Sequence, residues 1–313
     1  MASAHNSLPP GTRLDNYTIT KTIGGGGFSV VYLAADQASG QPTVIKEYMP
    51  GRLATRRADG EVMPRAPDDE RGFKSGRALF FQEASTLATV KHPNIVSVHN
   101  FFNANGTVYM VMPYEEGKNL QHYISKRRGK LSEAFLLTVF PALLDGLQLI
   151  HQHGYLHLDI KPSNIHLRPG GRPLLLDFGA VHRRLNSRQV QPGQVVSAGF
   201  SPVEQYDPKG YVGPWTDIYA IGATMRACID GHPPADARER RNRDPMRPAA
   251  QEFRRQYSPE LLEALDWALE VDPLLRPQRI EEFVQALPVL EPEPEPASGN
   301  DTILSRLTGR ARG

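Results

Sequence analysis

The first third of the chain carries the pattern of short β-strands. Apolar and polar residues alternate over residues 17–23 and again over 30–34, with the two-residue period of strands that bury one face. Two apolar runs, at 43–46 and 107–112, predict further strands. This part of the chain is therefore expected to form a β-sheet.

Helices account for most of the remaining pattern. Within the strand-rich part, apolar side chains recur at helical spacing over residues 79–90. From residue 120 onward most segments are helical, and Ser132-Glu133 is a typical helix start. The segments expected to be helical there are 121–128, 132–153, 259–269 and 280–287. The predicted fold class is α+β, with a small β-rich N-terminal lobe and a larger, mostly helical C-terminal lobe.

The composition is that of an ordinary globular protein. The chain has 313 residues, 40% hydrophobic and 22% charged, and its net charge of +2 predicts no overall attraction to nucleic acid or membrane. The single cysteine, Cys228, excludes a disulfide within the chain, which fits a reducing compartment, and we expect a cytoplasmic protein. The longest apolar segment, 134–150, is interrupted by polar residues and predicts a core helix, not a membrane span. Residues 1–10 lack the pattern of an export signal.

A glycine run lies between the first two predicted strands, at residues 24–27, and is followed by Phe28 and Ser29. Glycine lets the backbone approach an anion and direct its N–H groups at phosphate. Many loops contain such a run, and a dinucleotide-binding fold would place a helix after it. A strand follows instead, which favours a hairpin over the phosphates of a nucleotide.

One lysine and one glutamate are candidates for a phosphate clamp. Lys46 lies in the third predicted strand, directly after the glycine hairpin, and Glu83 lies in the predicted helix. A strand lysine is often a solvated edge residue, and a helix glutamate is often a surface carboxylate. After a glycine hairpin, the better interpretation is a lysine that contacts phosphates and is held by the glutamate.

The segment 155–179 concentrates the chemistry. Asp159 can accept a proton, Asn164 and Asp177 offer oxygen atoms to a hard cation, and Lys161 brings a positive charge beside them. Phosphoryl transfer needs this combination: a positioned hydroxyl, a divalent ion on the phosphates and additional positive charge. Taken singly, each motif is weak, and scattered surface carboxylates remain the alternative. Three nearby histidines suggest a metal cluster, but their spacing is irregular for metal ligands: His151, His153 and His157.

These motifs together resemble those of bacterial eukaryotic-type (Hanks-type) serine/threonine protein kinases, over about residues 17–287. The resemblance implies a bilobal protein-kinase fold over about 17–288, with ATP held between the lobes. The N-lobe is expected at about 17–114 with a polar insert at about 50–76, and the C-lobe at about 115–288. Residues 1–16 are then an N-terminal extension, and residues 289–313 are a Pro/Glu linker and a disordered tail.

The resemblance also assigns roles to residues. Asp159 becomes the catalytic base and Lys161 the partner of the γ-phosphate, while Asn164 and Asp177 become ligands of Mg²⁺. Lys46 and Glu83 become the ion pair at the α- and β-phosphates of ATP. Backbone groups near Met112, Tyr114 and Glu115 are candidates for contacts with the adenine edge. The hairpin over the phosphates comprises Ile23, Gly24, Gly25, Gly26, Gly27, Phe28, Ser29, Val30 and Val31.

Structural motifs of the same family follow. Residues 180–196 resemble an activation segment, and Ser201-Pro202-Val203-Glu204 resembles the A-P-E motif with one residue added. Ser197 falls where the family has a threonine that helps to define a Ser/Thr acceptor site. Asp217 is expected to brace the catalytic loop, and Arg276 is expected to pair with Glu204. These features favour a protein acceptor over a small-molecule acceptor, and the presence of Lys46, Asp159 and Asp177 disfavours an inactive pseudokinase.

Departures from the family pattern are expected to matter. Val44 replaces the alanine over adenine, and His166 replaces an apolar residue beneath it. Ser29 replaces the third glycine of the hairpin, and this small residue is expected to be tolerated there. Leu158 replaces the arginine that binds a phosphorylated activation loop, so basal activity is expected not to need loop phosphorylation. The predicted partners are protein substrates, with a cognate phosphoprotein phosphatase or a phosphopeptide-binding protein as further candidates. Candidate self-phosphorylation sites in the tail are Thr302, Ser305 and Thr308.

Overall fold

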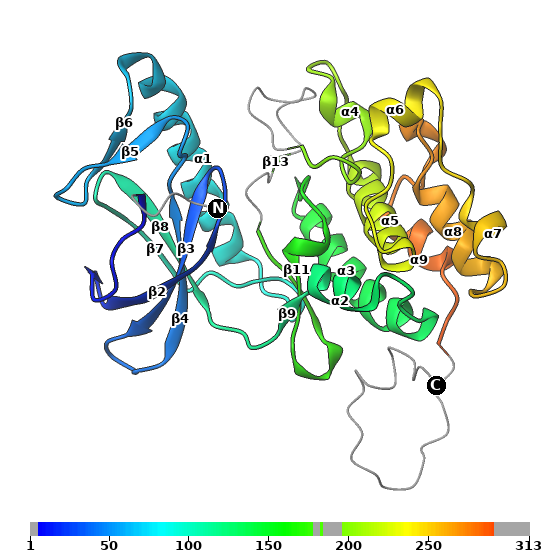
Figure 1. Cartoon of the computed structure of the whole chain (residues 1–313), viewed down its shortest axis with the longest axis horizontal. Helices are drawn as coiled ribbons and strands as arrows, with labels where there is room; N and C mark the ends of the chain where they lie inside the picture. Colours follow the sequence, from blue (N-terminus) through cyan, green and yellow to red (C-terminus); the bar gives the residue numbers. More distant parts are fainter. Residues whose placement is uncertain (1–5, 178–181, 184–195, 291–313) are drawn as a thin grey trace, which may run out of the picture. The chain divides into compact units, whose positions relative to one another are not determined.

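The computed structural model describes residues 6–177, 182–183 and 196–290 (Figure 1). The chain divides into two compact units. The first comprises residues 1–92 and 96–115, and the second comprises residues 93–95 and 116–313.

The first unit is built on a six-stranded antiparallel sheet with the order β1-β2-β3-β4-β8-β7. Its strands are β1 (Arg13–Leu14), β2 (Tyr17–Gly25), β3 (Ser29–Asp36), β4 (Pro42–Tyr48), β7 (Asn100–Ala104) and β8 (Thr107–Pro113). The alternating segments thus form strands, because this pattern lets one face of each strand enter the core. Leu8 and Leu14 are buried, so the ordered sheet unit includes residues that precede the matched strand at residue 17.

One long helix, α1 (Glu70–Thr89), packs against β7 and β8 of this sheet (Figure 1). It begins nine residues before the start expected from apolar spacing, because its first turns contain Gly72 and Gly76 and bury only Phe73. Before it lies a small hairpin of β5 (Ala54–Arg56) and β6 (Val62–Pro64), followed by the 3₁₀ turn η2 (Pro67–Asp69). A tight turn at Asp59-Gly60 joins these two strands, with Gly60 at φ 91°.

The second unit is mostly helical. Its longer helices are α2 (Leu120–Arg127), α3 (Glu133–Gln152), α5 (Pro214–Asp230), α8 (Pro259–Ala268) and α9 (Ile280–Ala286). Its shorter elements are α4 (Val203–Tyr206), α6 (Ala237–Asn242), α7 (Ala249–Glu252) and the 3₁₀ turns η3 (Pro162–Asn164), η4 (Pro169–Gly171) and η5 (Pro273–Leu275). Two small sheets complete it: β12-β11-β9 from Pro173–Leu175, Ile165–Leu167 and Lys118–Asn119, and β10-β13 from Tyr155–Leu156 and His182–Arg183.

The core of this unit forms where α3, α5, α8 and α9 pack together (Figure 1). Ser132 caps α3 as expected, since its Oγ accepts a hydrogen bond from the backbone N–H of Phe135 at 3.2 Å. Among the described residues, α3 alone is long and apolar enough to cross a membrane, but more than half of it is buried, as in a core helix. Helix α5 is buried on nearly all sides, which fits its apolar composition.

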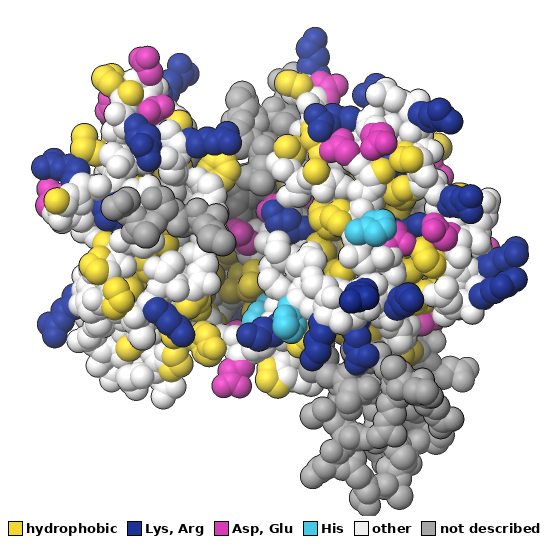
Figure 2. All heavy atoms as spheres, in the orientation of Figure 1, with side chains coloured by type: hydrophobic (Ala, Val, Ile, Leu, Met, Phe, Trp, Pro, Cys, Tyr) yellow, Lys and Arg dark blue, Asp and Glu magenta, His cyan; other side chains and the backbone are white. Residues whose placement is uncertain are grey.

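Charged side chains are scattered over the surfaces of both units on the face drawn in Figure 2. On the face drawn in Figure 2, lysine and arginine side chains are interspersed with acidic and apolar ones. Inside the helical unit, however, one charged pair is buried. Both ends of the guanidinium of Arg276 donate to the carboxylate of Glu204, at 2.7 and 3.2 Å, and Thr216 Oγ1 donates to the same carboxylate at 2.9 Å.

Substituting Arg276→Met is expected to destabilise the helical unit by about 3–5 kcal/mol, because the carboxylate of Glu204 would stay buried without a counterion. Chemical denaturation measures the loss as a decrease in the free energy of unfolding. The control is Arg279→Met, whose exposed pair with Glu282 is expected to contribute about 1 kcal/mol or less. Equal losses in the two variants would contradict the prediction.

Candidate active site

The glycine run forms the tip of the β2–β3 hairpin, as its strand-rich surroundings predict. Gly24 pairs with Val31 and Gly25 with Val30, and the backbone N–H of Gly26 donates to the carbonyl of Ser29 at 2.9 Å. Gly25 has φ 150°, which favours glycine, and nothing occupies the space that a Cβ on Gly26 or Gly27 would take. The hairpin therefore presents open backbone at its tip.

The tip of the hairpin is tied to the segment after β4. The backbone N–H of Met49 donates to the carbonyl of Phe28 at 2.9 Å, and that of Gly51 donates to the carbonyl of Gly27 at 3.1 Å. The side chains of Ile23 and Phe28 are exposed. These bonds anchor the far end of the hairpin to the strand that carries Lys46.

Lys46 and Glu83 lie side by side in the sheet unit. Lys46 Nζ is 3.3 Å from Glu83 Oε1, and both side chains are buried. The ammonium also lies over the ring of Phe80, 5.4 Å from its centroid. The strand β4 and the helix α1 thus bring together the lysine and glutamate that the sequence singles out.

The residues proposed for adenine contacts lie at the end of β8 and just after it. Met112 pairs with Val44 in the sheet, and its carbonyl accepts a hydrogen bond from Thr43 Oγ1 at 2.7 Å. Tyr114 is exposed. Glu115 is the last residue of the sheet unit.

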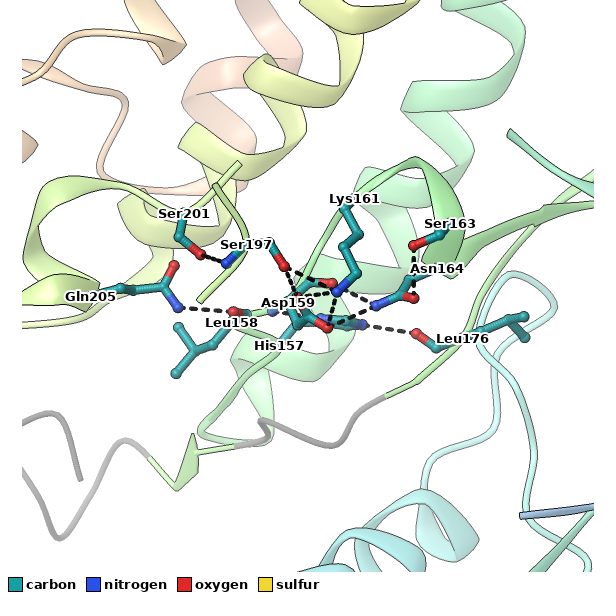
Figure 3. A network of polar contacts seen from close by, with 10 residues as sticks. All are labelled: His157, Leu158, Asp159, Lys161, Ser163, Asn164, Leu176, Ser197, Ser201 and Gln205. Carbon is teal, nitrogen blue, oxygen red and sulfur yellow. Dashed lines mark hydrogen bonds and ion pairs between the residues drawn. The ribbon is translucent and has the colours of Figure 1, made fainter. Parts of the chain in front are cut away.

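In the helical unit, Asp159 is the centre of a polar network (Figure 3). Lys161 Nζ donates to both of its carboxylate oxygens, at 2.9 and 2.8 Å. Asn164 Nδ2 donates to Oδ2 at 3.0 Å and to the backbone carbonyl of Asp159 at 2.8 Å. Ser197 Oγ donates to Oδ1 at 2.8 Å and lies 3.0 Å from the Lys161 ammonium. The carboxylate is thus oriented by three side chains.

Asp217 supports this loop from α5. Its carboxylate accepts the backbone N–H groups of His157 and Leu158, at 2.9 and 2.8 Å, and contacts His151 Nε2 at 2.8 Å. Burial by itself raises the pKa of Asp217, but the hydrogen bond and charge of His151 and the contacts of His157 outweigh it and hold the pKa below 3.8. Asp217 is therefore an anion that fixes two successive amides of the catalytic loop.

Leu158, whose backbone N–H is held by Asp217, has a left-handed backbone conformation. It has φ 61°, and its carbonyl accepts a hydrogen bond from Gln205 Nε2 at 2.8 Å. Its side chain is buried in an apolar cluster with Leu156 and Val212. A loop phosphate would therefore meet hydrocarbon at this position instead of a cation.

Asn164 and Asp177 flank the β11–β12 hairpin. The backbone N–H of Leu176 donates to the carbonyl of Asn164 at 2.8 Å, so Asp177 lies one residue beyond that bond. Asp177 has φ 61°, a left-handed conformation uncommon outside glycine. The hairpin thus places close together the two residues that the sequence predicts as metal ligands.

The donor set at this point fits a hard divalent cation. Because Asn164 Nδ2 is bound to Asp159, its amide oxygen, which accepts a hydrogen bond from Ser163 Oγ at 3.4 Å, is the atom that could bind a metal beside the carboxylate of Asp177. Among the described residues, no group of three or more His, Cys, Asp or Glu side chains could hold a metal. Phosphate oxygens and water would therefore have to supply the remaining ligands, as is usual for Mg²⁺.

The three histidines that suggested a metal cluster have separate structural contacts. His151 contacts Asp217, His153 Nδ1 lies 2.8 Å from the carbonyl of Leu149, and His157 Nε2 lies 3.1 Å from the carbonyl of Leu176. Sequence reasoning missed the contacts of His151 and Gln205, because each joins segments more than 40 residues apart. Phe178, Gly179 and most of the segment 180–196 lie outside the described residues.

The histidine of the loop is held neutral. Burial lowers the pKa of His157 below 6.5, although the charges of Asp217 and Asp159 oppose the shift. The backbone N–H of Asp159 donates to its Nδ1 at 3.2 Å, so Nε2 carries the proton and donates to Leu176. Protonating Nδ1 would remove the bond to Asp159.

His157 is expected to make folding sensitive to acid. Its pKa is lower in the folded than in the unfolded protein, so its stabilising contribution is complete above pH 6.5 and is lost progressively as the pH falls below that value. The free energy of unfolding should fall by up to about 1.4 kcal/mol per pH unit from this group. Denaturation across this pH range should show a shallower dependence for His157→Gln than for wild type. The exposed His99→Gln variant should keep the wild-type dependence, and an unchanged slope in His157→Gln would refute the assignment.

Comparison with known proteins supports the same family. The protein kinase domain model matches residues 17–287. A solved structure named "PpkA-294 apo form" has a TM-score of 0.80 and 38% sequence identity, and the match covers 90% of this chain and 100% of that chain.

Two curated relatives are serine/threonine kinases. Serine/threonine-protein kinase D of Synechocystis sp. is 31% identical over 68% of this chain, and Serine/threonine-protein kinase Nek3 of Mus musculus is 30% identical over 70% of it. The matches span only 40% and 39% of those two proteins. They confirm the expected resemblance and fold, and family members use ATP with a divalent metal to phosphorylate proteins. The chain belongs to the protein kinase family, and it is similar to the family's bacterial serine/threonine members.

Proposed function

We propose that this protein is a serine/threonine protein kinase that transfers the γ-phosphate of ATP to protein hydroxyls in the presence of Mg²⁺, and that it also phosphorylates itself. The observation that carries the proposal is the buried carboxylate of Asp159, held by Lys161, Asn164 and Ser197. This arrangement suits a group that must orient a hydroxyl and take its proton.

The hydrogen-bond-accepting positions of the Asp159 carboxylate are already occupied before an acceptor hydroxyl arrives. Asp159 accepts four hydrogen bonds from side chains, two from Lys161 and one each from Asn164 and Ser197. A carboxylate offers about four lone-pair sites, so the incoming hydroxyl must displace one donor. Lys161 is the donor with two bonds to release. Moving its ammonium toward the γ-phosphate frees the base and adds positive charge to the transferring group.

The transfer itself is a displacement at phosphorus. The acceptor oxygen forms a bond to the γ-phosphorus while the bond to the bridging β,γ-oxygen breaks, and the hydroxyl proton passes to Asp159. Mg²⁺, when bound, neutralises charge on the phosphate oxygens, and Asn164 and Asp177 are the residues that would hold it. Lys46, fixed by Glu83, supplies a second cation for the phosphates. The groups of this chain therefore align and stabilise charge more than they enter covalent chemistry.

The identity of the acceptor follows from the segment that contains Ser197. Ser197 binds the catalytic carboxylate, and its backbone N–H donates to Ser201 Oγ at 3.0 Å. The buried Glu204–Arg276 pair then secures the following residues. A built segment beside the base favours a protein acceptor over a small molecule. We further propose a phosphoprotein phosphatase or a phosphopeptide-binding protein as a partner, and a reducing, cytoplasmic location consistent with the single buried cysteine, Cys228.

Substituting Asp159→Asn is expected to lower kcat by about 10²- to 10⁴-fold, because the amide cannot accept the proton. Binding of ATP should be retained, since the substituted group acts on the acceptor hydroxyl. Transfer of labelled γ-phosphate to a generic protein acceptor measures the rate, and calorimetric titration measures ATP binding.

Two controls accompany this measurement. Glu260→Gln removes an exposed carboxylate on α8 and should leave the rate unchanged. A chelator should abolish the activity of wild type, and added Mg²⁺ should restore it. Undiminished transfer by Asp159→Asn would exclude the proposed role, and no transfer by wild type with Mg²⁺ and ATP would exclude the proposed function.

Phosphorylation of the activation segment is expected to be unnecessary for basal activity, because Leu158 offers an apolar side chain where a phosphate-binding cation would be needed. Ser187, which lies outside the described residues, is the position to substitute. Ser187→Ala should keep a rate within about twofold of wild type, which corresponds to less than about 0.5 kcal/mol in the barrier. Mass spectrometry identifies which serines are modified in the protein used. Loss of activity in Ser187→Ala would contradict this prediction. It would indicate that a phosphate on the segment is needed and is bound by a cation at a position other than 158.

A further inference from the structure

A buried carboxylate lies next to the lysine of β4. Glu47 is fully buried, although it carries a charge and has no part in the proposed transfer. Tyr32 donates its hydroxyl to Oε2 at 2.7 Å, and Tyr109 donates its hydroxyl to Oε1 at 2.6 Å. Burial and the charge of Glu47 raise the pKa of both phenols, so both remain donors. Neither phenol brings a positive charge to this site.

The counterion comes from the small hairpin before α1. Arg56 of β5 reaches Oε2 of Glu47 with its Nη2 atom at 2.5 Å, and its guanidinium is itself buried. Burial lowers the pKa of Arg56, but Glu47 more than offsets this effect, and the net shift is upward. The other donors of the guanidinium bind the carbonyl of Asn6 at 3.0 Å and that of Gly60 at 2.8 Å. One arginine thus joins the N-terminal segment, the hairpin and the strand that carries Lys46.

Successive residues of β4 divide their contacts between the two faces of the strand. Side chains alternate along a strand, so Lys46 and Tyr48 face one side and Glu47 faces the other. Tyr48 packs on Phe73 and Phe80 of α1, with ring centroids 5.6 and 5.8 Å apart. Its ring also fills the space that a Cβ on Gly76 of α1 would take. The orientation of the strand at residue 47 therefore decides how both neighbours meet the helix that carries Glu83.

We propose that Arg56 is a positioning residue for phosphoryl transfer, acting through Glu47 on the neighbouring Lys46. The inference rests on the proposed function. An ionised carboxylate stays buried only while a partner compensates its charge. Without Arg56, the carboxylate of Glu47 lies buried with no positive charge beside it, so β4 must shift to bring it toward water, and this shift displaces Lys46 from Glu83. The hairpin is then more than a surface insert, because it sets the geometry of the phosphate clamp.

The test is a double-mutant cycle in the full-length chain. Arg56→Met leaves Glu47 without its counterion, Glu47→Gln leaves Arg56 without its anion, and the double variant contains neither charge. The matched control is Arg57→Met, at the adjacent residue, whose pair with Asp59 is more than half exposed. Kinetic measurements give KM for ATP, KM for the protein acceptor and kcat. Calorimetry gives the affinity for Mg²⁺–ATP, and circular dichroism checks folding.

Arg56→Met is expected to lower kcat/KM for ATP by about 10- to 100-fold, as a small displacement of a positioning group does, while KM for the acceptor stays unchanged. The double variant should recover to within about threefold of wild type, because no uncompensated charge remains. Arg57→Met should equal wild type. A purely structural role would lower the amount of folded enzyme and leave both KM values unchanged.

Two results would overturn the proposal. One is a wild-type kcat/KM for ATP in folded Arg56→Met, and the other is a double variant as impaired as Arg56→Met. If Arg56→Met does not fold, the double variant decides, because recovery of folding with a normal KM for ATP supports the proposal and any other result refutes it. If wild type transfers no phosphate, the proposed function fails. The affinities for Mg²⁺–ATP then still report whether Arg56 acts through Glu47.

Discussion

The structure depends on hydrogen bonds and positive charges that compensate the negative charge of its buried carboxylates. An ionised group out of water is tolerated only where hydrogen bonds or an opposite charge replace its hydration, and the groups that do so become fixed. Asp217 is the clearest case, because its carboxylate is fully buried and is held by two backbone N–H groups and one histidine. The catalytic loop consequently has little freedom at His157 and Leu158. The position of Asp159 follows from that restriction, since it is the next residue.

The same constraint operates at other points of both units. Glu204 is compensated by Arg276, which secures the chain after Ser197. Glu83 is compensated by Lys46, which joins α1 to β4. In each case the partners come from distant parts of the sequence, so a single charge determines how two elements meet. Each buried anion loses its hydration, and the groups that replace this hydration make the site rigid. Catalysis by alignment requires that rigidity.

Sequence reasoning reached the fold and the residues of the catalytic loop because their signals are local. The alternation of residues 17–23 and 30–34 around a glycine run specifies a hairpin, and the spacing of Asp159, Lys161 and Asn164 lies within one short loop. The start of α1 escaped prediction, because Gly72 and Gly76 break the apolar repeat. A tertiary contact explains the glycine at residue 76, because the ring of Tyr48 occupies the space that a Cβ there would need. A pattern confined to the helix cannot reveal a contact made by a strand.

The Glu47–Arg56 pair shows the same limit more sharply. In the sequence, Arg56 is one of several arginines in a polar segment, and Glu47 is a charged residue beside a more obvious lysine. Both become buried only when the β5–β6 hairpin folds against the sheet, where the backbone N–H of Val62 in β6 donates to the carbonyl of Asn105 at 2.9 Å. That bond places the hairpin against the β7–β8 turn, and Arg77 of α1 donates to the carbonyl of the adjacent Gly106 at 2.9 Å. Hairpin, turn and helix therefore meet around one strand, and the charge of an inserted segment becomes part of the internal chemistry of the sheet unit. The cation that compensates Glu47 and the apolar cluster around Leu158 both come from the described residues, so groups of this chain help to hold the strand of Lys46 and the loop of Asp159.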